Sequence, residues 1–517
     1  MNARLLSIDV GTQSVRALVF DRHGELLDKA QIAIEPYFSQ QPGWAEQHAS
    51  VYWDALRAAC AQLWQQGKVS ADTLAGMALT TQRATLFCLD AQGEPLRPGI
   101  VWLDQRKCSA PPPLSGFWKL ALGLAGAGDL VAHFQREAEA NWIAQHQPEI
   151  WSKTAHYLLL SGYLSWRLTG EFVDSVGSQV GYLPFDYKGL QWAKAADFKW
   201  QAVPIRREQL PELRAPGSPL GTLSAAAAAD LGLPQGLPLI AAAADKACEV
   251  MGSGALTPEV AALSYGTTAT INTCRDSYLE VQRMLPPYPA ALPGAYNTEI
   301  QIYRGFWMVS WFKQEFGAPE EQIAASTGLP TEAVLDQQIR DIPAGSQGLM
   351  LQPYWSPGIR DPGPEAKGAI IGFSDVHTRA HVYRAILEGL AYALRHGREK
   401  IERTTRQPVR RLRVAGGGSQ SDVAMQITAD VFGLPAERPH VYEASALGAA
   451  INAAVGTGMH PDYRTAVRAM THVGDVFEPE PAAVRTYDRL YTRVYERMYG
   501  RMKPLYRQLR RTTGYPP

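Results

Sequence analysis

The sequence lacks several features that would assign it to a class at once. Its five cysteines are scattered and form no CxxC pair, which argues against structural zinc and against a disulfide framework. Basic and acidic residues number 50 each, so the charge balance gives no case for a nucleic-acid or membrane-surface partner. No apolar run is long enough to span a bilayer, and no signal-peptide pattern opens the chain. These absences make the reducing cytoplasm the expected compartment.

What is present is a long chain of ordinary globular composition. Its 517 residues exceed what one core usually organises, so two large domains are expected. Apolar residues make up 46% and charged residues 19%, as in soluble proteins. Periodicity predicts a helix over 50–65, strands over 76–80 and 85–89, and a helical stretch over 137–168. Strands interleaved with helices favour an α/β fold.

A weak internal repeat divides the chain into halves. An apolar strand, a Gly-Thr turn and a second apolar strand occur at Ile8–Val19 and again at Ala261–Asn272. The turn glycines lie 266 − 11 = 255 residues apart, about half the chain. We therefore predict two similar domains, over 1–252 and 253–517, each with a Gly-Thr hairpin.

The first hairpin is a candidate phosphate cradle. The chain has neither a GxxxxGK[ST] loop nor a GxGxxG turn after a strand, so phosphate binding needs another element. Glycine lets backbone N–H groups approach phosphate oxygens, and hydroxyls add donors. Asp9, just before Gly11, suits a Mg²⁺ anchor, and Arg16 on the next strand suits a phosphoryl contact. An ordinary β-turn is the alternative.

Asp245 follows a run of apolar and small residues, Leu237–Ala244, that is typical of a buried strand. Ligands of α/β sheets lie at the carboxyl ends of strands. Phosphoryl transfer to a hydroxyl needs a carboxylate that orients it and accepts its proton, so Asp245 is the candidate base. A helix N-cap is the alternative role for this residue.

A third element joins a strand to a helix over 423–432 through Gly416, Gly417 and Gly418. A turn without side chains leaves room for a flat ring or a phosphate at the helix N-terminus, and a simple tight turn is the alternative. Near the end, Tyr487, Tyr491, Tyr495 and Tyr499 recur every four residues among arginines, which predicts a final amphipathic helix packed by its tyrosines.

These elements, in this order and spacing, resemble the FGGY family of carbohydrate kinases. The resemblance extends from Leu5 to about Asp475. Several blocks carry it: SIDVGTQSVRALVFD, IVWLDQR, ADKACEVMGSG, SYGTTA, HTRAHVYRAILEGLAYALRHG, VAGGGSQSDVAMQITADVFGLP and EASALGAAINA. It implies two actin-like (ribonuclease H-like) domains, each a mixed β-sheet flanked by helices, closing on ATP and a sugar.

The resemblance also implies roles for single residues. Asp245 matches the catalytic base, and Asp9 matches a Mg²⁺-associated carboxylate. The nucleotide would be bound by the first hairpin, the second hairpin and the adenosine turn, which comprise Gly11, Thr12, Gln13 and Arg16; Gly266, Thr267 and Thr268; and Gly416, Gly417, Gly418, Ser419 and Gln420.

The sugar is less well determined. The block after the strand at 76–80 contains Gln82 and Arg83, and Trp102 and Asp104 are further candidates for the sugar pocket. Glycerol kinases typically carry Arg-Glu where this chain has Arg83 and Ala84, and xylulose kinases typically carry Met-His where it has Gln82 and Arg83. The expected activity is ATP-dependent phosphorylation of a small sugar or polyol: a ketopentose such as xylulose or a related pentitol, with glycerol less favoured.

Two other classes remain open. One is a catalytically silent actin-fold protein that senses a nucleotide, and the other is an ATPase with a protein client. The complete set of base, hairpins and adenosine turn favours the kinase over the silent protein. The blocks at His377–Gly397 and Val414–Ala453, which resemble sugar kinases, favour it over the ATPase. The sequence leaves the oligomeric state open, and a homodimer is among the possibilities.

Overall fold

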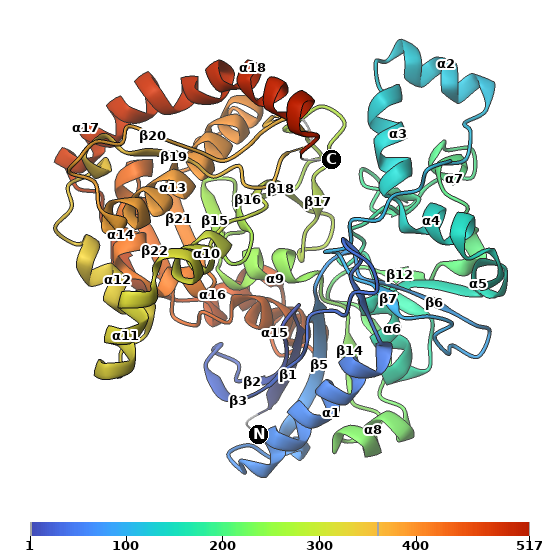
Figure 1. Cartoon of the computed structure of the whole chain (residues 1–517). Helices are drawn as coiled ribbons and strands as arrows, with labels where there is room; N and C mark the ends of the chain where they lie inside the picture. The colour runs from blue at the N-terminus through green and yellow to red at the C-terminus, as the bar shows by residue number, and fades with distance from the viewer. Residues whose placement is uncertain (1–2, 359–360, 516–517) are drawn as a thin grey trace. The chain divides into compact units, whose positions relative to one another are not determined.

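The structure is a computed structural model that describes residues 3–358 and 361–515. The chain forms two compact units (Figure 1). Unit 1 contains the described residues up to Gly254 together with Arg275–Asn297 and Ala444–Thr471, and unit 2 contains the remainder. The chain therefore returns to unit 1 twice after residue 254. The predicted division between 252 and 253 remains a prediction.

The main sheet of unit 1 is built around the first hairpin. Its strands lie in the order β13 (Pro219–Thr222), β14 (Pro238–Ile240), β5 (Leu74–Thr81), β1 (Arg4–Val10), β2 (Ser14–Phe20) and β3 (Leu26–Ala33). β1 pairs with β2 in antiparallel fashion and with β5 in parallel fashion. The hairpin and the strand at 76–80 are thus confirmed, and the parallel pairing brings the ends of β1 and β5 to the same edge.

Alternation along the strands decides which helices cover which face of this sheet. Leu6, Ile8 and Val10 pack with α1 (Ala49–Gln65), α6 (Leu160–Thr169) and α8 (Ala225–Leu231) in one core. The opposite face meets α15 (Ala444–Gly456), which contacts β1, β5 and β14. Asp9 has the parity of that second face. The predicted helix over 50–65 is confirmed as α1, whose Tyr52, Leu56, Ala59 and Leu63 are fully buried.

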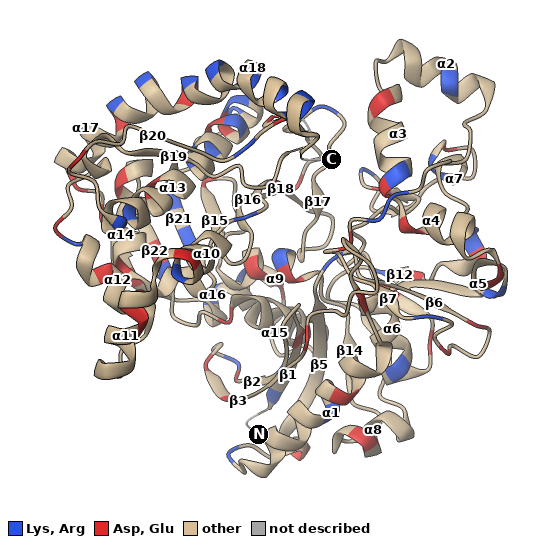
Figure 2. Ribbon diagram, in the orientation of Figure 1, with Lys and Arg blue, Asp and Glu red and all other residues tan. Residues whose placement is uncertain are grey.

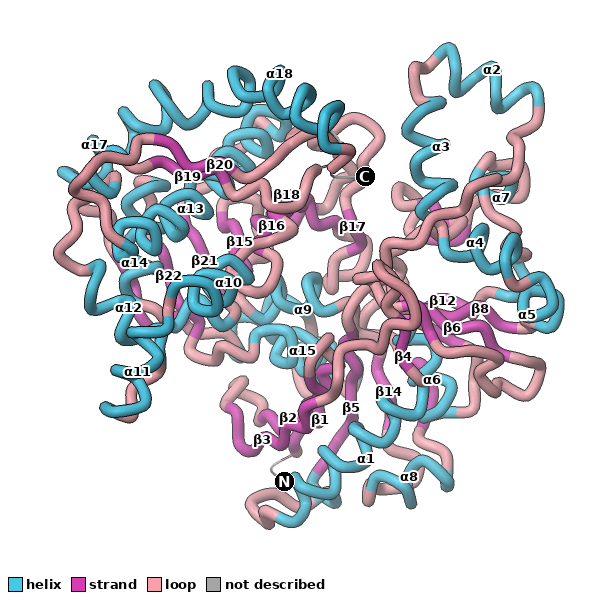
Figure 3. The backbone as a smooth tube through the Cα atoms, in the orientation of Figure 1, coloured by secondary structure: helices cyan, strands magenta, loops and turns pink. Residues whose placement is uncertain are grey.

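A second sheet in unit 1 corrects one prediction (Figure 3). It consists of β4 (Glu46–Gln47), β7 (Gly99–Ile100), β6 (Leu86–Leu89) and β8 (His156–Leu159). The stretch 137–168 is therefore not helical throughout, because β8 separates α5 (Pro148–Lys153) from α6. A four-residue apolar run beside a helix carries no periodic signal of its own, and pairing with β6 decides its conformation.

Further elements complete unit 1. They are α2 (Gly116–Leu124), α3 (Gly128–Glu137), α4 (Glu139–His146), α7 (Lys199–Ala202), α9 (Asp245–Gly252), α16 (Tyr463–Met470), β9 (Val173–Ser175), β10 (Phe185–Asp186), β11 (Gln191–Trp192), β12 (Glu212–Arg214) and β17 (Tyr288–Pro289).

Unit 2 repeats the arrangement of the first hairpin. Its strands lie in the order β18 (Tyr296–Ile302), β16 (Ala269–Arg275), β15 (Val260–Tyr265), β21 (Arg411–Ala415), β22 (Ala436–Pro439) and β23 (Val473–Phe477). β15 pairs antiparallel with β16 and parallel with β21, as β1 does with β2 and β5. The predicted repeat is therefore one of topology, and two mixed sheets flanked by helices confirm the expected fold.

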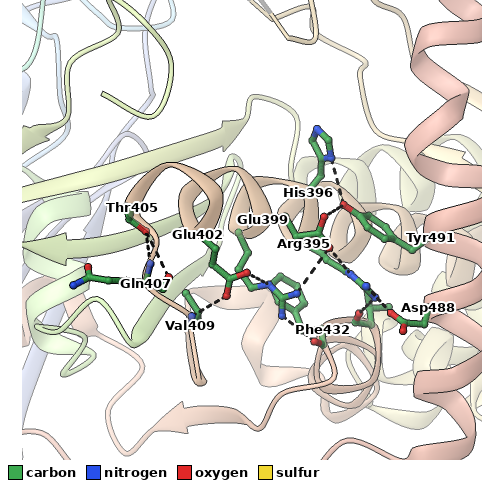
Figure 4. A network of polar contacts seen from close by, with 12 residues as sticks. Arg395, His396, Glu399, Glu402, Thr405, Gln407, Val409, Phe432, Asp488 and Tyr491 are labelled. Carbon is green, nitrogen blue, oxygen red and sulfur yellow. Dashed lines mark hydrogen bonds and ion pairs between the residues drawn. The ribbon is translucent and has the colours of Figure 1, made fainter. Parts of the chain in front are cut away.

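The long helix α13 (Arg379–Thr405) anchors the end of α14 (Asp422–Phe432) (Figure 4). Arg395 donates to the Val431 carbonyl at 2.8 Å, and Arg398 donates to the Phe432 carbonyl at 3.0 Å. The last carbonyls of a helix have no partner inside it, so these arginines satisfy them. Because α14 begins at the glycine turn, the network also fixes the element that carries this turn.

The chain ends in helices that pack through their tyrosines, as predicted. They are α17 (Pro481–Leu490), a π-helical turn η5 (Tyr491–Tyr495) and α18 (Glu496–Thr513). Tyr487, Tyr491 and Tyr495 are buried around Tyr392, with ring centroids 5.1–6.0 Å from it. Figure 2 shows several basic residues along α18.

Smaller elements complete unit 2: α10 (Trp307–Phe316), α11 (Ala318–Thr327), α12 (Thr331–Ile339), β19 (Met350–Gln352) and β20 (Ala369–Ile371). Across 3–358 and 361–515, no helix combines the length and the apolar character needed to cross a membrane.

Candidate active site

The turn of the first hairpin is held by its own backbone. The Gly11 N–H donates to the Ser14 carbonyl at 3.0 Å. Asp9 and Arg16 are opposite each other in the register, and the guanidinium donates to the carboxylate at 3.0 Å. Asp9 is only 4% exposed, so this ion pair limits the freedom of both groups. A metal role for Asp9 and a phosphoryl role for Arg16 remain predictions.

Two predicted sugar contacts meet the tip of this hairpin. The Trp102 indole N–H donates to the Thr12 hydroxyl at 3.0 Å, and that hydroxyl donates to Gln82 Oε1 at 2.9 Å. The Gln82 backbone N–H also donates to the Val10 carbonyl at 2.8 Å, which joins the ends of β5 and β1. The structure therefore brings Thr12, Gln82 and Trp102 together, while Gln13 is exposed.

The Asp104 carboxylate is already bound by donors from the protein itself. Its carboxylate accepts two side-chain hydrogen bonds from Arg106 at 2.8 and 2.7 Å, and backbone N–H bonds from Arg106 at 2.9 Å and Ala45 at 2.6 Å. Two carboxylate oxygens offer about four lone-pair sites, and these donors fill them. Its predicted contact with a sugar would have to replace one of these bonds.

Asp245 is the first residue of α9, at the end of the segment that continues from β14. The Lys246 backbone N–H donates to its carboxylate at 2.7 Å. Burial raises the pKa of Asp245 above its ordinary value, while the charges of Lys246 and Arg83 oppose this shift. Asp245 and Asp9 both act on the Cys248 thiol, whose pKa is raised to about 12, chiefly by burial. Both candidate carboxylates are thus within electrostatic reach of one buried side chain.

Arg83 lies near Asp245 in a setting that the sequence did not indicate. Its guanidinium is 5.1 Å from the centre of the Tyr288 ring, which belongs to the segment Arg275–Asn297 of unit 1. The next residue, Ala84, has φ +53°, a left-handed conformation that costs an L-residue about 1–2 kcal/mol. No local pattern signals Tyr288, because the contact joins distant parts of the chain.

The second hairpin and the glycine turn form one packed element in unit 2. Phe306 stacks on Tyr265 with ring centroids 4.4 Å apart, and its N–H donates to the Gly266 carbonyl at 2.9 Å. A Cβ on Gly418 would lie 2.3 Å from the Phe306 ring, and a Cβ on Gly416 would lie 2.9 Å from the Tyr265 carbonyl oxygen. Gly416 also has φ +88°, so two of the three glycines are required by packing.

The remaining predicted nucleotide contacts differ in exposure. A Cβ on Gly417 would meet nothing within 4 Å, and Thr267 and Gln420 are exposed. Thr268 is buried, and the Ser419 hydroxyl is buried and donates to the Gly416 carbonyl at 2.7 Å. Ser419 therefore stabilises the turn itself. Gly417 and Gln420 are the exposed part of the turn, where the adenine ring is predicted to lie.

Within the described residues, no cluster of three or more His, Cys, Asp or Glu side chains forms a metal cage. Mg²⁺ in kinases is usually held by one or two carboxylates, water and substrate phosphates. A single buried carboxylate such as Asp9, beside a glycine turn, fits that kind of site.

Comparison with known proteins agrees with the geometry. The models for the N-terminal and C-terminal domains of the FGGY family of carbohydrate kinases match residues 4–252 and 261–457. The chain belongs to this family. It is a sugar kinase, a phosphotransferase that uses ATP, as the sequence predicted.

Individual relatives span nearly the whole chain. An uncharacterized sugar kinase of Escherichia coli (strain K12) is 30% identical, with 94% of this chain and 91% of that protein covered. A xylulose kinase of Lactococcus lactis is 28% identical, with 94% of both covered. The crystal structure of a xylulose kinase from Rhodospirillum rubrum superposes with a TM-score of 0.79 at 27% identity, covering 98% of this chain and 100% of that one.

Proposed function

We propose that this sugar kinase phosphorylates a ketopentose such as xylulose, or a related pentitol, with Asp245 as the general base. The observation that carries the proposal is the setting of Asp245: a carboxylate at the start of α9, with a raised pKa and with Arg83 and Lys246 nearby. The xylulose kinases among the relatives support a ketopentose. Ala84 leaves no carboxylate at the position where glycerol kinases carry one, which disfavours glycerol.

In the proposed reaction, Asp245 orients a sugar hydroxyl and accepts its proton while the oxygen attacks the γ-phosphorus of ATP. The bond from phosphorus to the bridging oxygen breaks, and ADP leaves. The Gly11 and Gly266 N–H groups already donate within their own turns, to the Ser14 and Thr268 carbonyls. The proposed donors to phosphate oxygens are therefore the backbone N–H groups that follow them, at Thr12 and Gln13 and at Thr267. Gly417 and Gln420 are the proposed surface for adenosine. Mg²⁺, when bound near Asp9, supplies charge stabilisation for the phosphates.

The pKa of Asp245 gives a pH dependence. A base must be ionised to accept a proton, and burial raises the pKa of this carboxyl. Activity should therefore fall, as pH decreases, at a higher pH than an ordinary aspartate would set. Arg83 and Lys246 limit the shift because they favour the ionised form.

The test is ADP release over a panel of ketopentoses, pentitols, glycerol and erythritol, with Asp245→Asn beside the wild type. We expect turnover with a ketopentose or pentitol. In Asp245→Asn, kcat should fall by about 10³-fold or more, since a general base typically contributes about 10²- to 10⁴-fold to the rate. Asp54→Asn is the matched control, since Asp54 is an exposed carboxylate on α1. Wild-type turnover in folded Asp245→Asn would contradict the assignment.

A further inference from the structure

Four side chains of unit 1 form a continuous chain of hydrogen bonds. The Trp102 indole N–H donates to the Thr12 hydroxyl at 3.0 Å, and Thr12 donates to Gln82 Oε1 at 2.9 Å. The Gln82 amide Nε2 then donates to the Tyr52 hydroxyl oxygen at 3.0 Å. Gln82 is 3% exposed and Tyr52 is fully buried. The chain thus runs from the predicted sugar side, through the tip of the first hairpin, into the core.

The hydrogen bonds of these four side chains run in one direction. An indole N–H can only donate, so the Thr12 hydroxyl accepts from Trp102, and in the structure its single proton goes to Gln82. Oε1 of Gln82 lies toward Thr12 and accepts this proton. The amide NH₂ is left facing Tyr52, whose oxygen accepts. Along this series each donor is matched with one acceptor.

This direction has a consequence for Thr12. Its only hydroxyl proton is used by Gln82, so in this arrangement the hydroxyl offers no donor to a phosphate oxygen. In this arrangement the hydroxyl joins the hairpin tip to Trp102 and Gln82, and a contact of Thr12 with the nucleotide stays a prediction. The Gly11 N–H donates to the Ser14 carbonyl, so the proposed phosphate donors of this turn are the backbone N–H groups of Thr12 and Gln13.

Tyr52 is a rigid end point for the chain. It lies on α1, and its ring meets the Phe87 ring edge-on with centroids 6.2 Å apart. Phe87 packs in turn against Tyr163, at 5.0 Å, in the same core. Because the packing fixes the position of the Tyr52 hydroxyl, the Gln82 amide has to orient toward it to form the hydrogen bond.

We propose that Tyr52 is a positioning residue: through Gln82 and Thr12 it sets the orientation of Trp102, and so aligns the sugar side of the site with the phosphate hairpin. The proposal rests on the proposed function for its effect on catalysis. Tyr52 is fully buried, so the proposal gives it no contact with either substrate. Its hydroxyl should matter only as long as the chain of hydrogen bonds beyond it is intact.

The first test detects the series of hydrogen bonds directly by NMR and does not require an activity assay. The indole N–H resonance of Trp102, one of 13 tryptophans, is assigned in ¹⁵N-tryptophan-labelled protein by its loss in Trp102→Phe. Tyr52→Phe and Thr12→Val should both move this resonance. Tyr163→Phe is the matched control, because Tyr163 is equally buried in the same core and its hydroxyl pairs with Arg167 instead. A Trp102 resonance that Tyr52→Phe leaves in place overturns the proposal.

The second test is a double-mutant cycle on KM for the sugar. Tyr52→Phe should raise this KM about 2- to 10-fold, the equivalent of one net hydrogen bond, and Thr12→Ser should restore most of what Thr12→Val loses. In the Thr12→Val background, Tyr52→Phe should have no further effect, because the chain is already broken. Fully additive effects overturn the proposal.

The two tests separate the possible failures. Absence of turnover in the wild type counts against the proposed function, and the NMR result still decides the hydrogen-bond chain. If Tyr52→Phe does not fold, Gln82→Met interrupts the same chain one step nearer to Thr12 and is measured in the same way. An unmoved Trp102 resonance in folded Gln82→Met also overturns the proposal.

Discussion

Asp174, on β9, shows how burial and hydrogen bonding compete at a single residue. Its carboxylate is 1% exposed and accepts bonds from Ser161 and Gln179, both at 2.8 Å, and from the Ser175 N–H at 2.7 Å. These donors lower its pKa, but burial is the larger effect and raises the pKa to about 6. The charged form is therefore costly in the folded protein, despite three partners.

A pH-dependent stability follows from this pKa. The folded-state pKa lies above the unfolded value near 3.9, so the contribution of Asp174 is fully present below that value and is lost as pH rises through about 6. The loss is roughly 3 kcal/mol in the free energy of unfolding, because the folded and unfolded pKa values differ by about 2. Denaturant unfolding of wild type and Asp174→Asn between pH 4 and 7 measures it. We expect a smaller decline in Asp174→Asn; parallel pH profiles would contradict the assignment.

At the scale of elements, a glycine required by packing and a glycine proposed to bind nucleotide can be distinguished within one turn. Gly418→Ala places a Cβ 2.3 Å from the Phe306 ring, which is itself stacked on Tyr265. Such overpacking typically costs about 1–3 kcal/mol of stability. Gly417→Ala meets open space, so its stability should stay within about 0.5 kcal/mol of wild type.

The two substitutions should therefore affect different properties, one the stability of the fold and the other the binding of ATP. Gly418→Ala should lower the midpoint of denaturant unfolding, and Gly417→Ala should raise KM for ATP several-fold, because its methyl group lies on the proposed adenosine surface. Unfolding curves and ATP titrations of the sugar-dependent rate measure both. Unchanged KM for ATP in Gly417→Ala would remove Gly417 from the nucleotide site.

Elements with a strong local signal were predictable from sequence, and those set by distant pairing were not. The α1 helix follows from the spacing of Tyr52, Leu56, Ala59 and Leu63, and both hairpins follow from apolar runs around a Gly-Thr turn. β8 was missed because its conformation depends on β6. In the site, Thr12, Gln82 and Trp102 do lie together, but which atoms they use, and the part of Tyr52, needed the three-dimensional arrangement.

On the scale of the whole molecule, elements that pack together can lie far apart in the sequence. Asp245, the proposed base, lies on α9 within the first 254 residues, yet the helix that packs against α9 is α15, nearly 200 residues later (Figure 1). The two helices meet at glycines: a Cβ on Gly448 would lie 1.9 Å from the Cys248 carbonyl oxygen, and one on Gly252 would lie 1.9 Å from that of Ala444. Because these nearest atoms belong to the backbone, no flexible side chain could move aside to admit a methyl group.

Gly448→Ala should therefore act on the active site from outside it. To admit the methyl group, α9 and α15 must separate, which should cost at least about 2 kcal/mol of stability and shift Asp245 at the start of α9. Small displacements of a catalytic group cost about 10²-fold in rate, so kcat should fall by a similar factor in the folded fraction. Gly500→Ala on α18 is the control: nothing lies within 4 Å of its Cβ, and the helix should gain up to about 1 kcal/mol. If Gly448→Ala matched Gly500→Ala in both stability and kcat, the position of Asp245 would not depend on the packing of α9 against α15.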